Sequence, residues 1–394
     1  DVALRSGAQL VHPGYGFLAE APAFAQDCVD AGLTFVGPRP ETMELLSDKP
    51  AARAVAQEQG IPVVEGSAST LDDAGLRQAA DRIGYPVMIK AVAGGGGMGI
   101  RAAHSPEDLE AAIPRARQEA QAAFGDDGLY VERLVEDARH IEVQLLGDTR
   151  GHVIHLGERE CSIQRRHQKL IEEAPSRALD EDLRRRIHEA AVQIGEAVGY
   201  VSAGTVEFLL GPDGRFTFME VNPRLQVEHT VTEAVTGVDI VKEQLRIAAG
   251  RELRYAQEDV TVQGWAVECR ILAEDPDRGF APCVGKISRL REPAGPGVRV
   301  DSGVSEGVTV TPYYDSLLAK LIAWGETRGV AIVRIRRALE EYQIVGVTTN
   351  LRLYRALMNS TRFLGGQFDT GFMEERFSAA GAGSTTAGAD AGAA

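Results

Sequence analysis

The chain has 394 residues, of which 44% are hydrophobic and 25% are charged, and its formal net charge is -15. This length is sufficient for two or three domains with a large core. The acidic balance argues against a nucleic-acid partner, and no apolar run reaches the roughly 18 residues that a membrane-spanning helix needs.

The cysteines and the chain ends add three expectations. Four scattered cysteines show neither the CxxC spacing of a zinc site nor a disulfide framework, and no signal-peptide pattern opens the chain, so we expect a cytoplasmic protein. The chain begins at Asp1 without an initiator Met, and we expect it to be truncated. Residues 378–394 are almost wholly Ala, Gly, Ser and Thr and are predicted to form a disordered tail or linker.

The first predicted elements alternate between strand and helix. Residues 8–11 read as a strand that runs into the loop HPGYGF at 12–17, and a helix is expected over about 22–31. Residues 35–36 form a short second strand. This order predicts an α/β unit at the start of the chain.

A helix is predicted to begin at the SDKP sequence of residues 47–50, with a capping residue before the proline and Gly60 as its stop. Lys49 then lies at the helix entrance. A compact segment from about 62 to 135 follows, with two helices, a glycine-rich hairpin and a strand at 129–132.

The glycine run GGGGMG at residues 94–99 formally matches the dinucleotide fingerprint GxGxxG. A dinucleotide-binding loop opens a helix, whereas residues 100–103 continue as a strand and the next helix starts after Ser105. The glycines therefore connect a hairpin whose first strand spans 85–92, and such a flap can cover phosphates beside Lys90. A flexible turn without a ligand is the alternative.

Two β-rich runs, 205–210 and 215–221, are joined by Gly-Pro-Asp-Gly and predict a second hairpin. In the simplest register Glu207 lies diagonal to Glu220 on one face, roughly 7 Å apart, with Asn222 nearby. Oxygen ligands at this spacing suit Mg²⁺ or Mn²⁺. The alternative is a hairpin whose charged face is simply solvated.

The sequence EVNPRLQVEH extends this hairpin. If the strand persists, Glu220, Asn222, Arg224, Gln226 and Glu228 share one face. Such a polar row cannot be buried unpaired, and it predicts a charged ligand.

The sequence ERECSIQRRHQK at residues 158–169 is locally basic in an acidic chain. This reversal of sign favours anion binding, with Gln164, His167 and Lys169 as candidates for ribose or phosphate contacts. A solvated surface patch is the alternative. From about 135 to 377, long strands and amphipathic helices predict an α+β region on an antiparallel sheet.

Together these segments resemble the biotin carboxylase family of the ATP-grasp superfamily, and the resemblance covers nearly the whole chain. The matching motifs are HPGYGFLAE at 12, SDK at 47, IKAVAGGGG at 89, ERLVEDARHIEVQ at 132, ERECSIQRRHQKLIEEAP at 158, GTVEF at 204, EVNPRLQVEHTVTE at 220, AVECRILAEDP at 266 and YYDSLLAKL at 313.

The resemblance implies an ATP-grasp fold of mixed α/β and α+β class. A truncated N-terminal α/β domain with its linker would span 1–61, and a mobile lid with the glycine flap 62–134. Residues 135–377 would hold the second ATP-grasp half and a C-terminal antiparallel-sheet domain, with the ATP-grasp region at about 53–249, followed by the tail at 378–394.

The resemblance also implies the site residues. Mg²⁺ or Mn²⁺ would be held by Glu207, Glu220 and Asn222. Bicarbonate would be bound by Lys169, Arg224, Gln226 and Val227, with Glu228 as its base and Arg270 facing the biotin enolate. ATP would contact Lys49, Lys90, Gly96, Gly97, Glu132, Arg133, Leu134, Val135, His140, Gln164 and His167.

Two positions differ from the common family pattern: Met98 replaces a Lys or Arg after the glycines, and Arg133 replaces a frequent Lys. No biotinyl-lysine motif occurs, so biotin would arrive on a separate carrier domain or chain. A carboxyltransferase subunit would be a further partner, and the full-length form would be a homodimer. The final acceptor stays open among acetyl-, propionyl- and methylcrotonyl-CoA, pyruvate and urea. Another ATP-grasp ligase of the carbamoyl-phosphate-synthetase type, or a silent nucleotide-binding scaffold, are the alternative functions.

Overall fold

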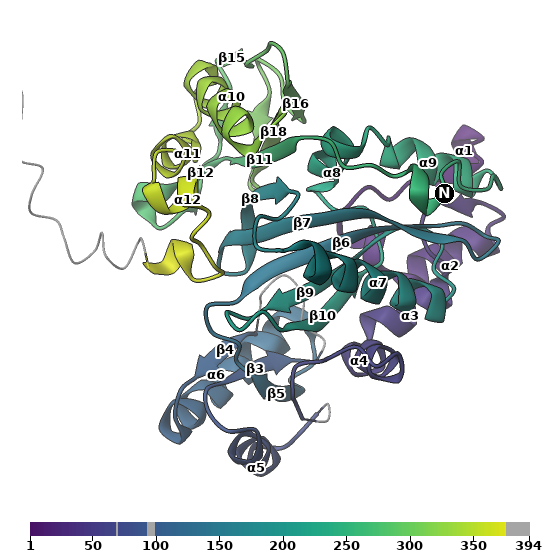
Figure 1. The fold of residues 1–394 in the computed structure, drawn as a ribbon, viewed down its shortest axis with the longest axis vertical. Helices are drawn as coiled ribbons and strands as arrows, with labels where there is room; N and C mark the ends of the chain where they lie inside the picture. The colour runs from purple at the N-terminus through teal and green to yellow at the C-terminus, as the bar shows by residue number, and fades with distance from the viewer. Residues whose placement is uncertain (68–69, 93–98, 376–394) are drawn as a thin grey trace, which may run out of the picture.

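The computed structural model describes residues 1–67, 70–92 and 99–375 (Figure 1). Its N-terminal part contains α1 (Val2–Ser6) and a parallel pair of strands, β1 (Leu10–Val11) and β2 (Thr34–Phe35), connected through α2 (Pro22–Asp30). A parallel pair with a helical crossover confirms the α/β unit predicted there.

Two helices lead from this unit to the rest of the chain: α3 (Pro40–Ser47) and α4 (Lys49–Glu58). The α4 cap is the predicted one, because the Asp48 side chain accepts a hydrogen bond from the Ala51 N–H at 3.0 Å. Lys49 is the first residue of the helix, as its sequence indicated.

A small sheet forms a separate layer at the bottom of Figure 1, with the strand order β4-β3-β5. It consists of β3 (Val87–Ala91), β4 (Arg101–Ala103) and β5 (Leu129–Arg133), covered by α5 (Asp73–Ile83) and α6 (Pro106–Phe124). Since β3 and β4 pair antiparallel, the strands on either side of the glycine run form a hairpin, and the element that follows the run is a strand and not a helix. Gly96, Gly97 and Met98 themselves lie outside the described residues.

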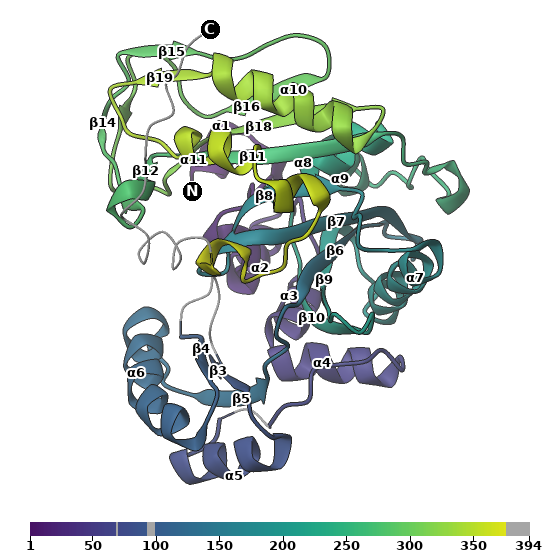
Figure 2. The ribbon, with the colours of Figure 1, turned by 60° about the vertical axis from the view of Figure 1, so that its left-hand side comes forward.

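An eight-stranded antiparallel sheet dominates the molecule, with the order β10-β9-β6-β7-β8-β11-β18-β16 (Figure 2). Its strands are β6 (Arg139–Gly147), β7 (Val153–Arg165), β8 (Gln168–Ala174), β9 (Ser202–Leu210), β10 (Phe216–Asn222), β11 (Trp265–Leu272), β16 (Val298–Ser302) and β18 (Leu317–Gly325). The strands β7 and β8 carry the basic cluster into the middle of this sheet.

The two faces of the large sheet differ in character. On one face α7 (Glu181–Ala197) packs apolar side chains such as Ile187 and Ile194 against Ile141 and Val143 of β6. The other face carries charged residues beside α8 (His229–Thr236) and α9 (Ile240–Ala248). Because side chains alternate along a strand, each strand contributes to both faces.

At the C-terminal end, α10 (Arg328–Glu341), α11 (Leu351–Leu357) and α12 (Thr361–Gly365) pack near β11 and β18 around a core that includes Ile335 and Leu321. None of the helices in the described part of the chain combines the length and the apolarity required to cross a bilayer.

Candidate active site

The polar face of the large sheet gathers three carboxylates around the ammonium group of Lys169. Lys169 Nζ donates to Glu207 Oε1 at 2.8 Å and to Glu228 Oε1 at 2.6 Å, and it also contacts Glu142 Oε2. All three carboxylates are buried. A single cation does not neutralise three buried carboxylates, so the cluster depends on further cations.

The guanidinium group of Arg270 on β11 supplies one of them. Its Nε donates to Glu172 Oε1 at 2.5 Å and its Nη2 to Glu228 Oε2 at 2.8 Å. Burial by itself raises the pKa of Glu228, but the positive charges of Lys169 and Arg270 outweigh burial and hold this pKa well below its usual range. Glu228 is therefore an ionised carboxylate between two fixed cations.

The predicted metal ligands lie on neighbouring strands, although their register differs from the expected one. Glu220 is directly opposite Glu207, and not diagonal to it, because the pairing shifts between Phe218 and Glu220. A β-bulge at Met219 inserts one extra residue into β10 and causes this shift. Directly opposed residues share a face, so both carboxylates still point the same way.

The donor set of this ribbon fits a divalent cation. Glu207 and Glu220 offer carboxylate oxygens, and the buried Asn222, opposite Thr205, offers its amide Oδ1, whereas its Nδ2 is a donor without a hydrogen-bond partner. Glu220 Oε2 also lies 3.9 Å from Lys49 Nζ. Carboxylate and amide oxygens are the ligands that Mg²⁺ and Mn²⁺ prefer.

The polar row beyond the hairpin does not form by strand alternation, and that expectation was wrong. β10 ends at Asn222, and the chain turns, with the Arg224 N–H donating to the Asn222 carbonyl at 2.8 Å. Pro223 lacks the N–H that would continue the ladder. Glu228 instead precedes the first residue of α8, and its side chain reaches the cluster through contacts with β8 and β11.

Arg224 and its neighbours line the segment between strand and helix. Arg224 Nε donates to Glu20 Oε1 at 2.7 Å, and its Nη1 donates to Gln226 Oε1 at 3.0 Å. The Val227 carbonyl accepts a hydrogen bond from Lys320 at 2.8 Å. The predicted anion-binding residues 224–227 therefore lie in one turn next to Glu228.

A second cluster of charged side chains lies at the small sheet and is centred on the Glu132 carboxylate. Lys90 Nζ donates to Glu132 Oε2 at 2.6 Å, and Arg53 Nη1 donates to Glu132 Oε1 at 2.7 Å. Among the residues expected near adenine, the Leu134 N–H donates to the Pro86 carbonyl and Arg133 binds the Glu65 carboxylate. Glu132 is thus held by two cations from different parts of the chain.

His140 contacts the cluster from β6, and His167 lies in the turn between β7 and β8. His140 Nε2 lies 3.1 Å from Glu207 Oε2. His167 is exposed, and desolvation by the surrounding chain, with the positive charges of Lys90 and His140, lowers its pKa against the opposing charge of Glu374. Gln164 is buried and pairs with Lys169 across the same hairpin.

The turn that carries His167 is strained. Arg165 pairs with Gln168, and the two residues between them have positive φ angles, 48° at Arg166 and 63° at His167. Two-residue turns of this kind favour Asn-Gly. Arg166→Asn is therefore expected to raise the free energy of unfolding by about 0.5–1 kcal/mol, measured as a higher urea midpoint. Arg166→Lys keeps the strain and should leave the midpoint unchanged; equal midpoints for both variants would contradict the prediction.

Several residues of the site were not predicted from the sequence. They are partners of the predicted residues, and all of them except the half-buried Arg53 are buried: Arg53, Glu142, Arg159, Glu172 and Lys320. The alternation His140, Glu142, Gln144 along β6 was a usable signal, because three polar residues on one face of a central strand need partners.

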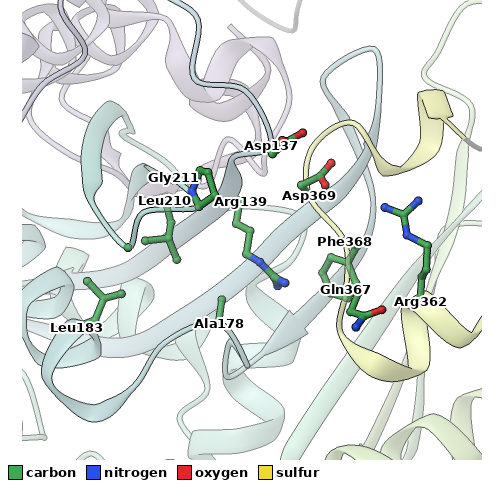
Figure 3. Close-up of a pocket in the computed structure, with 12 residues that line it drawn as sticks. Asp137, Arg139, Ala178, Leu183, Leu210, Gly211, Arg362, Gln367, Phe368 and Asp369 are labelled. Carbon is green, nitrogen blue, oxygen red and sulfur yellow. The ribbon is translucent and has the colours of Figure 1, made fainter.

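A cavity of about 480 Å³ lies on the other face of the sheet, beside the start of β6 (Figure 3). Arg139 projects into it, with Nη1 3.3 Å from Glu160 Oε2, Nη2 donating to the Gly366 carbonyl at 2.6 Å, and the guanidinium 5.1 Å from the Phe368 ring centre. Among the described residues that line it, none belongs to the predicted site. Since adjacent residues point to opposite faces, this cavity is separate from the cluster at His140.

Comparison with protein families covers the chain in three consecutive parts. Residues 1–43 match the family described as biotin carboxylase, N-terminal domain. Residues 48–256 match carbamoyl-phosphate synthase L chain, ATP binding domain, and residues 268–375 match biotin carboxylase C-terminal domain.

Individual relatives show the same similarity. The chain is 51% identical over 375 residues to the biotin carboxylase of Nostoc sp., covering 95% of the chain and 84% of that protein. Biotin carboxylase 1 of Bacillus subtilis is 48% identical over 378 residues, with 95% and 84% covered.

Solved structures have the same fold. The biotin carboxylase domain dimer of the 2-oxoglutarate carboxylase from Hydrogenobacter thermophilus, in complex with MgADP, ADP and bicarbonate, matches with a TM-score of 0.94 and 49% identity, covering 95% of this chain and 83% of that one. A biotin carboxylase–β,γ-ATP complex from Campylobacter jejuni matches with a TM-score of 0.92 and 44% identity, with the same coverage.

Proposed function

This chain belongs to the biotin carboxylase family and is an ATP-dependent ligase, and on that premise we propose which residues bind each substrate and which carry the chemistry. The reaction is the carboxylation of biotin by bicarbonate with MgATP, through carboxyphosphate. The observation that carries the assignment is the position of Glu228, which accepts hydrogen bonds from both Lys169 and Arg270.

We assign bicarbonate to the turn beside this carboxylate. Lys169 and Arg224 provide positive charge, and Gln226 and Val227 provide polar groups in the same turn. Glu228 would take the proton from the bicarbonate hydroxyl as the bicarbonate oxygen attacks the γ-phosphorus and ADP leaves.

The low pKa of Glu228 is consistent with this role only if its cations are shared with the substrate. A carboxylate whose pKa lies far below neutrality is a weak base. When bicarbonate enters, Lys169 divides its hydrogen bonds between the anion and the protein, so Glu228 loses part of its stabilisation and its pKa rises. Binding of bicarbonate would in this way make Glu228 a stronger base for the bicarbonate proton.

The nucleotide would lie between the small sheet and the large one. We assign its phosphates and ribose to Lys49, Lys90, Gly96, Gly97, His140, Gln164 and His167, and its adenine to residues 132–135. Glu207, Glu220 and Asn222 would hold Mg²⁺ or Mn²⁺, which offsets phosphate charge when bound. Glu132 orients the Lys90 ammonium in advance, since the two are 2.6 Å apart.

Biotin would bind on the β11 side of the cluster. Carboxyphosphate yields CO₂ and phosphate, and closure of the lid over the site would exclude water. The released phosphate would take the proton of the ureido nitrogen of biotin, so that negative charge develops on the ureido oxygen while the nitrogen attacks CO₂. Arg270, a planar and permanently charged donor, would stabilise that oxygen.

The partners follow from the family. Biotin carboxylases act with a biotin carrier and a carboxyltransferase, and the Hydrogenobacter domain is a dimer, so we propose these partners and a homodimer for this chain. Relatives named for pyruvate and for 2-oxoglutarate are 48% and 50% identical to it. We therefore propose that the carboxyltransferase partner selects the final acceptor.

One assay separates this function from its alternatives. ADP release that rises only when bicarbonate and free biotin are both present supports biotin carboxylation. ATP binding without turnover would favour a nucleotide-binding scaffold. ADP release that requires bicarbonate but does not change when biotin is added would favour a ligase of the carbamoyl-phosphate-synthase type.

Glu220→Gln is expected to weaken the apparent affinity for Mg²⁺ by about tenfold or more and to lower ATP hydrolysis in parallel, because a charged ligand oxygen is lost. A Mg²⁺ titration of ADP release measures both effects. Asp213→Asn removes a carboxylate from the turn of the same hairpin and serves as the control. A Glu220→Gln titration that superimposes on that of the control would contradict the metal assignment.

A further inference from the structure

Lys320 is a buried cation of the active site to which no role has been assigned. It lies on β18 directly opposite Arg270 of β11, and 4% of its surface is exposed. Opposed residues of an antiparallel pair point to the same face, so the ammonium and the guanidinium are neighbours. Two like charges side by side in a buried position destabilise the fold unless anions compensate them.

Lys320 has acidic neighbours but no carboxylate in close contact. The positive charge of Lys320 is the largest influence opposing the rise that burial causes in the pKa of the buried Glu268 carboxyl, although no hydrogen bond joins the two side chains. The nearest carboxylate oxygen paired with it, Asp301 Oδ2, is 3.7 Å from Nζ, and the ring centre of Tyr15 is 5.9 Å away. Arg270, in contrast, donates to two carboxylates at 2.5 and 2.8 Å. The closest contact of Lys320 is a neutral group, the Val227 carbonyl, at 2.8 Å.

That carbonyl lies at the start of α8, where a cation is electrostatically unfavourable. The N-terminus of a helix carries partial positive charge, so an ammonium group placed there does not stabilise the helix. The position of Lys320 therefore has no explanation in helix stability. It is explained if the turn needs a fixed orientation and if an anion arrives beside Lys320 and Arg270.

The turn itself has few other restraints at Val227. Its flanking residues are tied elsewhere: the Gln226 carbonyl accepts from His229 Nδ1 at 2.8 Å, and Glu228 binds Lys169 and Arg270. The Lys320 bond fixes the peptide plane between these two side chains. Rotation of that plane would move both the proposed bicarbonate amide Gln226 and the proposed base Glu228.

We propose that Lys320 is a positioning residue for the bicarbonate half of the active site, acting through the Val227 carbonyl. The inference rests on the proposed function. Lys320 holds the turn in the orientation that presents Gln226 and Glu228 to bicarbonate, and its charge adds to that of Arg270 on the side where the anions bind.

The test is a comparison of Lys320→Met, Lys320→Gln and Asp301→Asn with the wild-type chain. ADP release is measured against bicarbonate concentration, ATP affinity by calorimetry, and the thermal midpoint in parallel. Lys320→Met is expected to raise KM for bicarbonate about 10- to 100-fold, the size of one lost charge-assisted hydrogen bond, with ATP affinity within about twofold of wild type. Lys320→Gln keeps a donor at this position, so its KM for bicarbonate should lie between the values of the wild type and of Lys320→Met.

Asp301→Asn is the matched control, because it removes the weak carboxylate partner of Lys320 and leaves the Val227 contact intact. Its KM for bicarbonate should stay at the wild-type value. If Lys320→Met does not fold, Lys320→Gln decides, with an expected rise in KM of about threefold or more.

The outcomes separate the two proposals. Wild-type KM in a folded Lys320→Met or Lys320→Gln variant overturns the role of Lys320 and leaves the proposed function intact. Equal losses of ATP and bicarbonate affinity, together with a lowered thermal midpoint, overturn the positioning role of Lys320 and indicate a purely structural one. Wild-type ADP release that ignores bicarbonate overturns the proposed function and this inference with it.

Discussion

Glu228→Gln is expected to lower biotin-dependent ADP release by about 10²-fold or more while ATP affinity stays close to the wild-type value. The amide cannot accept the bicarbonate proton, so the chemical step loses its base. ATP affinity should persist because the proposed nucleotide contacts lie on other residues, on α4, in and after the small sheet, on β6 and β7, and in the turn after β7.

The variant should also fold, which makes the result interpretable. Lys169 retains Glu142 and Glu207 as partners, and Arg270 retains Glu172. Removing one of several carboxylates therefore leaves no buried cation unpaired.

Glu233→Gln, on the helix α8 that begins directly after Glu228, is the control for this measurement. Its carboxylate accepts from the Ile240 N–H and binds Arg299, away from the cluster. Turnover of the control should stay near wild type. A Glu228→Gln variant that loses ATP binding, or that turns over at the wild-type rate, would rule out the role of general base.

Arg159→Met is expected to have the largest effect on stability, lowering the free energy of unfolding by about 3–5 kcal/mol. Arg159 is fully buried, and four of the five N–H groups of its guanidinium have acceptors. Its contacts are Glu142 Oε1 at 2.5 Å, Gln144 Oε1 at 2.7 Å, Thr205 Oγ1 at 3.0 Å and Thr232 Oγ1 at 3.0 Å.

The loss arises because one substitution removes several buried hydrogen bonds that tie β6, β9 and α8 together. Glu142 keeps Lys169 as its remaining cation, while the buried amide and hydroxyl groups lose their donor. Urea unfolding followed by circular dichroism measures the change, and Glu142→Gln combined with Arg159→Met should cost less than the sum of the single variants.

Arg215→Met is the matched control, since the Arg215 side chain is 88% exposed on the β9–β10 hairpin. Its effect should stay within about 0.5 kcal/mol. Arg159→Met stability within about 1 kcal/mol of wild type would show that the buried network contributes little to the fold.

The local elements of the fold were predictable because their signals are local. Asp48 caps α4, and Ser105 caps α6 by accepting from the Asp108 N–H. The glycine run was correctly assigned to a hairpin, since the residues after it pair with β3. Each of these features depends on residues within a few positions of one another.

The register of the hairpin and the course of the chain after it were not predictable in the same way. The bulge at Met219 changes which residue faces Glu207, and the chain leaves the sheet at Pro223. A bulge depends on how the whole strand packs against its neighbours, and the sequence of the strand alone does not predict that packing. The conclusion that Glu207 and Glu220 share a face nevertheless holds, because direct and diagonal partners are on the same side.

From the sequence alone came the α/β beginning, the two hairpins, the charged residue types of the site and the resemblance to biotin carboxylases. Local propensity, turn chemistry and ordered motifs are properties of short segments, so they can be identified from the sequence without a structure. Only the tertiary structure brought Lys169, Glu228 and Arg270 into contact from three separate elements and revealed the buried partners Glu142, Arg159 and Lys320. Compensation of buried charge is a pairing between distant segments, and it is decided by the packing of the sheet against α8.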